Sequence, residues 1–247
     1  MNINDPVLEF TDVTVATTPL GHAGLSHVNA RFRPGTLTII KVEPGNEQLP
    51  IADLAEGLLC PAEGRVAFQG EPWTTMLPEQ VLQRRAQIGR VFDGHGWISN
   101  LNVNENVTLS QRHHTRRPIA EILAEAEALA RAFGLSELPK TRPALVAHQD
   151  LRRSEWIRAF LGQPLLVLLE RPMQGVPLQH LPRLIGAVRE ACAHKAAVLW
   201  LTDSSRPLGE SGPESRNRVE RHSELPPTTQ YAMRGLNLVA ITNSVLN

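Results

Sequence analysis

The residues best placed to do chemistry are Glu170 and Arg171, which directly follow five apolar residues, Leu165 to Leu169. A run of this length is too short to span a membrane and is typical of a strand buried on both faces of a mainly parallel sheet. Pro172 then ends the strand, because proline lacks the amide that a sheet ladder needs. Open α/β sheets bind their ligands at the carboxyl ends of their strands. We therefore expect Glu170 and Arg171 at a ligand site.

Two other groups of reactive side chains give weaker signals. His113 and His114 are adjacent in sequence, so a helix would not present both imidazoles on one face, and we predict no metal site there. Cys60 and Cys192 lie in apolar, helical-looking segments. We expect both to be buried, reduced thiols of a cytoplasmic protein.

The composition of the chain excludes several classes of protein. Its 247 residues suit one large α/β domain, or one domain with a small appendage. The formal net charge is zero and there is no basic stripe, which argues against a nucleic-acid partner. The N-terminus lacks the features of a signal peptide, and no run approaches the roughly 18–20 apolar residues of a spanning helix. We expect a soluble, cytoplasmic protein that reaches the inner membrane only through a partner.

Hydrophobic periodicity places the elements that would position these residues. Alternation predicts strands at Val7–Val15, Leu25–Phe32 and Thr36–Val42, with a turn at Pro34–Gly35. Helical patterns cover residues 77–86, 119–135 and 181–194, and a second apolar strand ends near residue 202. Residues 204–229 are polar and contain four prolines, which indicates a flexible connection. A closing pair of short strands is predicted at residues 231–239.

Three segments resemble ABC (ATP-binding cassette) ATPases, and they occur in the order of that family. They are Gly57–Gly64 (GLLCPAEG), Asn102–Val107 (NVNENV) and the apolar strand before Arg171–Pro172. The resemblance implies an α/β fold with a P-loop-NTPase-like, mainly parallel sheet and helices on both faces. It also implies a small N-terminal antiparallel sheet formed by the three early strands. Residues 1–203 would form the ABC-like domain, with a helical subdomain at about 93–162, and residues 204–247 the connection and closing strands.

The segment that corresponds to the phosphate loop has lost the residue types of that motif. The motif has the form G-x-x-x-x-G-K-[ST], in which backbone amides and lysine bind phosphates and the hydroxyl binds magnesium. Residues 42–50 align with it. Gly45 is the only glycine retained, Gln48 replaces the lysine and Leu49 replaces the hydroxyl residue.

Electrostatics also oppose phosphate binding at this segment. Glu43 and Glu47 place negative charge where the phosphates of a nucleotide would lie. Unit charges about 4 Å apart repel by roughly 4 kcal/mol at an effective dielectric near 20. A helix N-terminus near Pro50 would offset only about 0.3–1 kcal/mol. Repulsion is therefore the larger effect, and we expect neither ATP nor Mg²⁺ as a cofactor.

The other nucleotide-contacting positions of the family are altered as well. Glu170 takes the place of the magnesium-associated aspartate and Arg171 that of the catalytic glutamate. The family's glutamine that senses magnesium and water is replaced by Asp93, and its switch histidine by Asp203. Residues 146–150 (VAHQD) replace the Leu-Ser-Gly-Gly-Gln signature, and Arg153 and Arg158, which follow it, are expected to be solvated or paired surface charges. The resemblance thus implies a catalytically inactive relative, a pseudo-ATPase, with no catalytic residue.

The best-preserved segment, residues 97–109, points to a protein partner. In the family this loop and helix line the groove that receives a short helix of the membrane subunit. The resemblance implies that Trp97, Ile98, Leu101 and Val103 contact a membrane permease subunit, although these apolar residues are equally consistent with a core. Within the family, residues 92–135 look most like subunits of bacterial lipid-trafficking transporters.

Several alternatives remain open at the level of sequence. A second, active ABC ATPase is a possible partner, although a chain without a phosphate loop and signature would weaken both sites of such a pair. One alternative function is a divergent ABC ATPase with residual ATP binding. The other is an interaction domain unrelated to transport.

Overall fold

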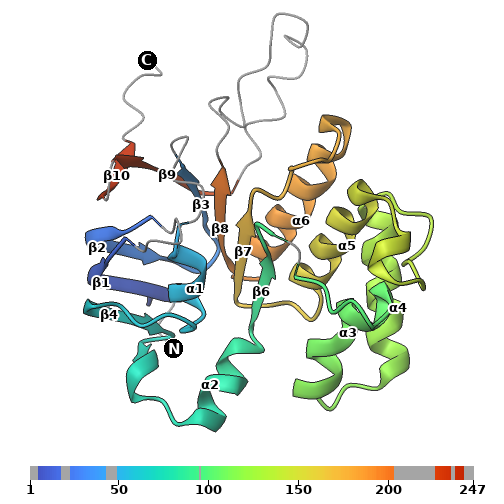
Figure 1. Ribbon diagram of the computed structural model, residues 1–247, viewed down its shortest axis with the longest axis horizontal. Coiled ribbons are helices and arrows are strands. Elements are labelled where there is room, and N and C mark those ends of the chain that lie inside the picture. The colour runs from blue at the N-terminus through green and yellow to red at the C-terminus, as the bar shows by residue number, and fades with distance from the viewer. Residues whose placement is uncertain are drawn as a thin grey trace, which may run out of the picture.

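The computed structural model describes residues 5–17, 23–42, 49–94, 96–202, 226–234 and 237–241. Within these residues a central sheet stands between a small antiparallel sheet and a group of helices (Figure 1). The expected fold class, a mainly parallel sheet with helices and a small antiparallel sheet, is confirmed.

The central sheet has the strand order β10-β9-β3-β8-β7-β6. Its strands are β3 (Leu37–Lys41), β6 (Ile88–Val91), β7 (Leu166–Glu170), β8 (Ala197–Thr202), β9 (Thr228–Arg234) and β10 (Asn237–Ile241). Neighbouring strands are parallel except β9 and β10, which form an antiparallel pair. The apolar strand identified in the sequence is thus β7, between β6 and β8, and Glu170 is its last residue.

The antiparallel sheet differs from the expectation in one strand. It has the order β2-β1-β4-β5 and is formed by β1 (Leu8–Val15), β2 (Leu25–Phe32), β4 (Glu63–Phe68) and β5 (Glu71–Pro72). The third early strand, expected here, is β3 of the central sheet. The prediction was wrong because β3 is buried at four consecutive positions, 37–40, and three of these are apolar, which suits a strand covered on both faces.

The helices lie on both sides of the central sheet. They are α1 (Ile51–Ala55), α2 (Pro78–Arg85), α3 (Val103–His114), α4 (Ile119–Ala132), α5 (His148–Phe160) and α6 (Leu181–Ala193), with 3-10 turns η1 (Trp73–Thr75), η2 (Pro143–Leu145) and η3 (Leu178–His180). Helices α3, α4 and α5 pack on one another beside β6 (Figure 1). The N-terminus of α3 is closed by Glu105, whose carboxylate accepts a 2.7 Å hydrogen bond from the Asn102 amide.

The hydrophobic core has two halves, one on each face of the central sheet. Leu166 and Leu168 of β7 pack toward α1 and the antiparallel sheet, whereas Val167 and Leu169 pack toward α3–α6. This alternation confirms that β7 is buried on both faces. On the side of α3–α6, helix α5 packs so closely on β6 that only glycine fits at position 89. A Cβ there would lie 1.8 Å from the Ala159 carbonyl oxygen.

The cysteine prediction is half correct. Cys192 is buried in α6, and burial raises the pKa of its thiol to about 11. Cys60 is exposed, because the chain has left α1 and turns toward β4 at that point. Across the described residues, no helix is both long and apolar enough to cross a bilayer.

Candidate functional site

Glu170 ends β7 as a buried carboxylate that is already bound within the chain. Its Oε2 atom accepts a 2.6 Å hydrogen bond from Nε of Arg90 in the neighbouring strand β6. Nη1 of Arg90 donates to Asp53 of α1 at 2.7 Å and to Glu56, the residue that follows α1, at 2.6 Å. We call these four residues the Arg90 cluster. It joins the helix after the phosphate-loop segment to the strand that carries the magnesium-associated position.

The Arg90 cluster contains one guanidinium and three carboxylates; Arg90, Glu56 and Glu170 are mostly buried, whereas the side chain of Asp53 is 42% exposed. Burial raises the pKa of Glu170 and of Glu56, although Arg90 opposes both shifts. Burial would lower the pKa of Arg90, but hydrogen bonds and charge from its carboxylate partners dominate and raise it. The guanidinium also lies 4.5 Å from the centre of the Phe92 ring. Arg90 therefore stays charged and fills the space between the three carboxylates.

Arg171 and Asp93 form a second ion pair beside this cluster. Nε of Arg171 donates to Oδ1 of Asp93 at 2.5 Å, and Nη2 donates to the other carboxylate oxygen. Two-point pairing of this kind is the strongest geometry that arginine makes with a carboxylate. The backbone of Arg171 has a φ of 43°, in the left-handed region that residues with a Cβ adopt at a cost of roughly 1–3 kcal/mol. The fold thus holds a strained backbone at the position of the family's catalytic glutamate.

Helix α5 holds both sides of this ion pair in place. Arg152 is buried and donates to the Phe92 carbonyl oxygen at 2.6 Å and to the side chain of Gln174 at 3.0 Å. Trp156 donates its indole N–H to the Pro172 carbonyl oxygen at 2.9 Å. These bonds join α5 to the chain segments that carry Asp93 and Arg171, so the pair is supported on two sides.

The expectation that Arg153 and Arg158 are surface charges is wrong. Arg153 is buried, donates to the Gly134 carbonyl oxygen at 2.8 Å and pairs with Asp150 at 2.5 Å. Arg158 donates to the Gly96 carbonyl oxygen at 2.5 Å and lies over the Trp97 ring at 5.0 Å. Burial lowers the pKa of Arg158. Both arginines satisfy backbone carbonyls that sequence patterns do not reveal.

The described part of the phosphate-loop segment is apolar. Val42 and Leu49 are buried and belong to the core beneath the antiparallel sheet. Leu49, at the position of the magnesium-binding hydroxyl, has no oxygen in its side chain. Gly45 and Gln48 lie outside the described residues, as do Glu43 and Glu47, and so does Asp203 at the switch position.

The signature positions make contacts within the chain. Helix α5 begins at His148, and the residue before it, Ala147, offers no side-chain oxygen to its first amides. The carboxylate of Asp150 is engaged by Arg153. Gly175, after β7, lies against His148 so closely that a Cβ there would stand 2.6 Å from the imidazole ring. The signature segment is therefore packed on the loop that follows Glu170 and Arg171.

The predicted partner segment divides into core and surface. Val103 is fully buried in α3, so it cannot contact a partner, and the prediction for this residue was wrong. Trp97 and Leu101 are half-buried, and Trp97 packs on the core beneath α3–α6. Ile98 is 44% exposed. The buried amide of Asn106 bonds to both the N–H and the carbonyl of Ile98, which fixes the loop that presents this side chain.

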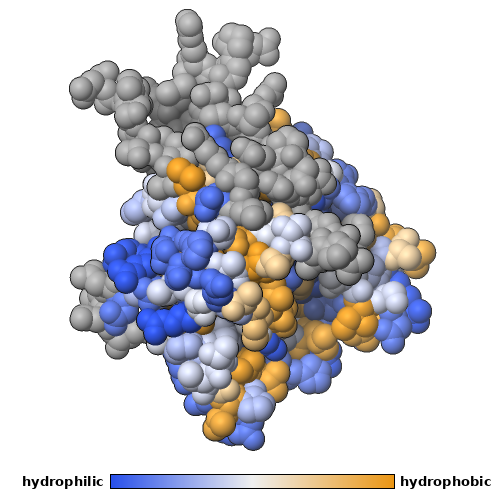
Figure 2. All heavy atoms as spheres, turned by 60° about the vertical axis from the view of Figure 1, so that its left-hand side comes forward, coloured by the Kyte–Doolittle hydropathy of each residue, from blue (hydrophilic) through white to orange (hydrophobic). Residues whose placement is uncertain are grey.

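Further apolar surface lies at α2. Leu77 and Leu82 have 65% and 53% of their surface exposed. Figure 2 shows a band of apolar residues that runs toward the lower edge of the molecule, the end at which α2 lies in Figure 1. Exposed apolar surface of this kind is typical of contact sites for other molecules.

The carboxylates and histidines of the described residues were compared with the ligand sets that metal ions require. No group of three or more His, Cys, Asp or Glu side chains among them is placed to hold a metal. The carboxylates nearest to such a group are those of the Arg90 cluster, where a guanidinium occupies the centre. Arginine at position 171 cannot accept a proton from water, because a guanidinium stays protonated in proteins. His113 and His114, at the end of α3, are exposed.

Sequence reasoning found Glu170, Arg171 and Asp93 but missed Arg90, Asp53 and Glu56. One signal was available, since Arg90 is the only charged residue of the β6 sequence IGRV. Asp53 and Glu56 are three positions apart and therefore lie on one face of the first helix. Their contact with Arg90 depends on the placement of α1 against the sheet, which no local pattern encodes.

The arrangement defines a class of protein, a P-loop-NTPase-like α/β domain with an added antiparallel sheet and a helical layer. Comparison with solved structures shows which known fold it shares. A dimeric bacterial ABC transporter cassette, MJ0796, has the same fold, with a TM-score of 0.76 and 18% identity over 94% of this chain and 96% of that one. No protein-family model matches the chain.

Curated sequences agree with this placement. An uncharacterized ABC transporter ATP-binding protein of Mycobacterium tuberculosis is 29% identical over 151 residues, which is 60% of each chain. The intermembrane phospholipid transport system ATP-binding protein MlaF of Escherichia coli is 24% identical over 168 residues, 67% of this chain and 62% of MlaF. The chain thus matches about three fifths of the length of these relatives. By fold and by sequence likeness the chain is similar to ABC-type nucleotide-binding domains, which confirms the resemblance.

Proposed function

We propose that this chain is a catalytically inactive ABC subunit, a pseudo-ATPase that binds to a membrane transport complex and supports or regulates it. The observation that carries the proposal is the ion pair between Arg171 and Asp93. A guanidinium at the catalytic position cannot activate water. Arg171 is bound by Asp93, which stands at the family's water-sensing position, so the two replaced residues neutralise each other's charge.

The Arg90 cluster supports the same conclusion. Glu170 would have to release Arg90 before it could approach a magnesium ion. That release would leave Arg90 buried without one of its three carboxylate partners. Breaking a buried ion pair from one side typically costs about 3–5 kcal/mol. Two factors thus oppose the binding of magnesium-bound nucleotide: the free energy needed to release Glu170, and the lack of a lysine at position 48 and of a hydroxyl residue at position 49.

The proposed contact with a membrane subunit lies on the loop before α3. Trp97, Ile98 and Leu101 remain the candidate contacts, and Ile98 is the most exposed of the three. The loop is rigidly held by Asn106, so Ile98 is presented without further ordering cost. The expected partner is the permease of an ABC-type transporter, with a lipid as the possible substrate class because MlaF belongs to a phospholipid transport system. On this proposal the chain acts at the inner face of the membrane.

Site-specific crosslinking tests the proposal directly. A photoreactive residue at Ile98 is expected to label a multi-span membrane protein in intact cells. The matched control is Leu145, which is 76% exposed in η2 outside this loop and should label that protein far less. Equal labelling from both sites, or none from Ile98, contradicts docking through this loop. Saturable binding of MgATP by the purified chain would instead favour a divergent ATPase.

A further inference from the structure

The loop that joins β6 to α3 carries Ile98, the most exposed of the three proposed partner contacts. We call its described residues, 92–94 and 96–102, the docking loop. Three arginines from outside this loop donate hydrogen bonds to it, and they come from two elements. They are Arg152 and Arg158 of α5 and Arg171, the residue after β7. The docking loop is therefore bound at several points to the structure around it.

The start of the docking loop is bound through both side chain and backbone. Asp93 pairs with Arg171 through both of its carboxylate oxygens. Nη1 of Arg152 donates to the Phe92 carbonyl oxygen at 2.6 Å, and its Nη2 donates to the Gln174 side chain at 3.0 Å. The Gln174 amide in turn donates to the Arg171 carbonyl oxygen at 2.9 Å. Arg152 and Arg171 thus join the start of the loop to the segment that follows β7.

Arg158 binds the next part of the docking loop. Its Nη1 atom donates to the Gly96 carbonyl oxygen at 2.5 Å. Its guanidinium lies 5.0 Å from the centre of the Phe92 ring and 5.0 Å from that of the Trp97 ring, within the range of cation–π attraction. Nε and Nη2 of Arg158 are buried and have no hydrogen-bond partner among the described residues. The two rings of the loop are therefore the main compensation for burying this charge.

Two glycines show where the docking loop touches its support. A Cβ at Gly96 would lie 2.6 Å from the Phe92 ring and 3.1 Å from Nη2 of Arg158. A Cβ at Gly94 would meet no atom within 4 Å. One added methyl group would therefore disturb the contact with Arg158 at position 96 and would disturb nothing at position 94.

We propose that Arg152, Arg158 and the Arg171–Asp93 pair are positioning residues, which hold the docking loop in the conformation that the membrane partner binds. This inference rests on the proposed function. It gives the altered nucleotide site a role, because residues at the family's catalytic and water-sensing positions here support an interaction surface. A loop that is already ordered binds without the entropy cost of ordering it. Since the chain's own arginines hold the loop, docking requires no nucleotide.

The test measures labelling of the multi-span membrane protein from a photoreactive residue at Ile98 in intact cells. Gly96→Ala, Arg158→Met and Arg171→Met should each reduce the labelling by about threefold or more, because the loop must then be ordered on binding. Gly94→Ala is the matched control for Gly96→Ala and should label as the wild type does. Arg171→Lys keeps the charge at this position and should label more than Arg171→Met.

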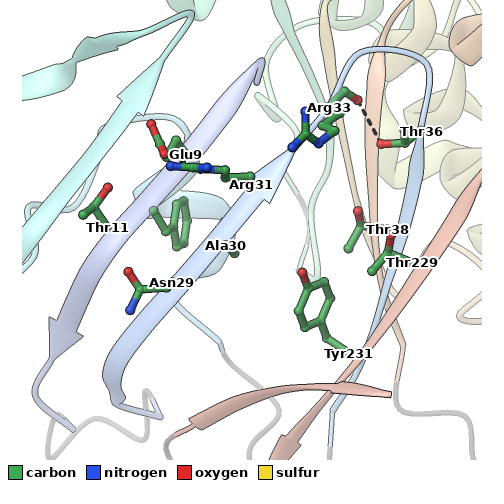
Figure 3. Close-up of a pocket in the computed structure, with 11 residues that line it drawn as sticks. Glu9, Thr11, Asn29, Ala30, Arg31, Arg33, Thr36, Thr38, Thr229 and Tyr231 are labelled. Atoms are coloured by element: carbon green, nitrogen blue, oxygen red, sulfur yellow. Dashed lines mark hydrogen bonds and ion pairs between the residues drawn. The ribbon is translucent and has the colours of Figure 1, made fainter. Parts of the chain in front are cut away.

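Two arginine controls separate positioning from stability. Arg153→Met removes a buried arginine of the same helix that donates to the Gly134 carbonyl oxygen instead of the loop. It should lower Tm without lowering the labelling. Arg31→Met removes an arginine from a carboxylate pair, as Arg171→Met does, since Arg31 pairs with Glu9 in a polar cavity between the two sheets (Figure 3). It should label as the wild type does.

Hydrogen exchange of the purified protein provides a readout that needs no partner. The Ile98 amide donates to Oδ1 of Asn106 at 2.8 Å and should be protected. Its exchange should be faster by about tenfold or more in Gly96→Ala and Arg158→Met, but not in Gly94→Ala. Normal labelling in both Gly96→Ala and Arg158→Met would overturn the positioning role and leave docking at Ile98 intact. A wild type that labels nothing from Ile98 would overturn the docking surface and this inference together.

Discussion

Arg171 and Asp93 are 78 positions apart in the chain, yet they form a two-point ion pair beyond the carboxyl end of β7. In ABC ATPases the two corresponding positions hold a catalytic glutamate and a glutamine that senses magnesium and water. Here both positions carry charge, and the two charges neutralise each other. The relationship explains how charged residues at these two positions are compatible with a well-packed fold.

The first prediction concerns the energy of this pair. Arg171→Met and Asp93→Asn should each reduce the free energy of unfolding by about 1–3 kcal/mol, because each removes a two-point ion pair from a mostly buried position. A double-mutant cycle followed by urea unfolding should give a coupling energy of about 0.5–3 kcal/mol. The same cycle at the exposed Lys140–Glu137 pair is the control and should give less than about 1 kcal/mol. Additive losses at 171 and 93 would show that the pair contributes nothing.

The second prediction concerns Arg90 and pH. Arg90→Met should reduce stability by about 3–5 kcal/mol near neutral pH, since Glu170 and Glu56 become buried carboxylates without a cation. Burial raises the folded-state pKa of both above the ordinary value near 4.5. A carboxyl group whose pKa is higher in the folded than in the unfolded protein binds its proton more tightly when folded. Its contribution to the free energy of unfolding is therefore fully present below the unfolded-state pKa and is lost as the pH rises through the folded-state pKa.

Arg90→Met should therefore lose more of its free energy of unfolding, relative to the wild type, at pH 8 than at pH 5. Chemical denaturation at both pH values measures this loss. Lys140→Met, which removes a cation from an exposed pair, serves as the control and should show a small, nearly constant loss. A loss in Arg90→Met that is equal at both pH values would mean that the carboxylates find other partners.

The sequence predicted the position of the site better than its internal contacts. The apolar run before Glu170 identified a strand buried on both faces, and strands of that kind end at the ligand edge of a sheet. The partners of Glu170 were missed because Arg90 and Glu56 meet it only through tertiary packing. The third early strand was assigned to the wrong sheet, since its residues predict a strand but do not specify its neighbours. Arg153 was misjudged because its carbonyl partners leave no mark in the sequence.

The third prediction concerns repair of the altered site. The variant Gln48→Lys with Arg171→Glu should have no ATPase activity above a buffer control, because Leu49, Asp93 and the signature segment remain unchanged. It should also be less stable than the wild type, since a glutamate at 171 faces Asp93 without a cation. Adding Leu49→Ser should lower the free energy of unfolding by about 2–4 kcal/mol more, because Leu49 is part of the core. Measurable turnover in the double variant would contradict this account.

The fourth prediction separates surface from core in the partner segment. Ile98→Ala should change the free energy of unfolding by less than about 1 kcal/mol and weaken association with the membrane partner. Val103→Ala should destabilise the fold by about 1–3 kcal/mol, because Val103 is fully buried. Trp97→Ala is expected to weaken association as well, but Trp97 also packs on the core, so Ile98 is the cleaner probe. Normal association of Ile98→Ala in a detergent pull-down would place the docking surface elsewhere.

The most direct test of the central claim is a calorimetric titration of the purified protein with MgATP. The account predicts no saturable heat up to millimolar nucleotide, because Arg171 is held by Asp93, Glu170 is held by Arg90, and Leu49 offers no ligand to magnesium. Buffer-matched MgCl₂ without nucleotide supplies the baseline. A saturable, magnesium-dependent isotherm in the micromolar range would contradict the account and identify the chain as a nucleotide-binding subunit.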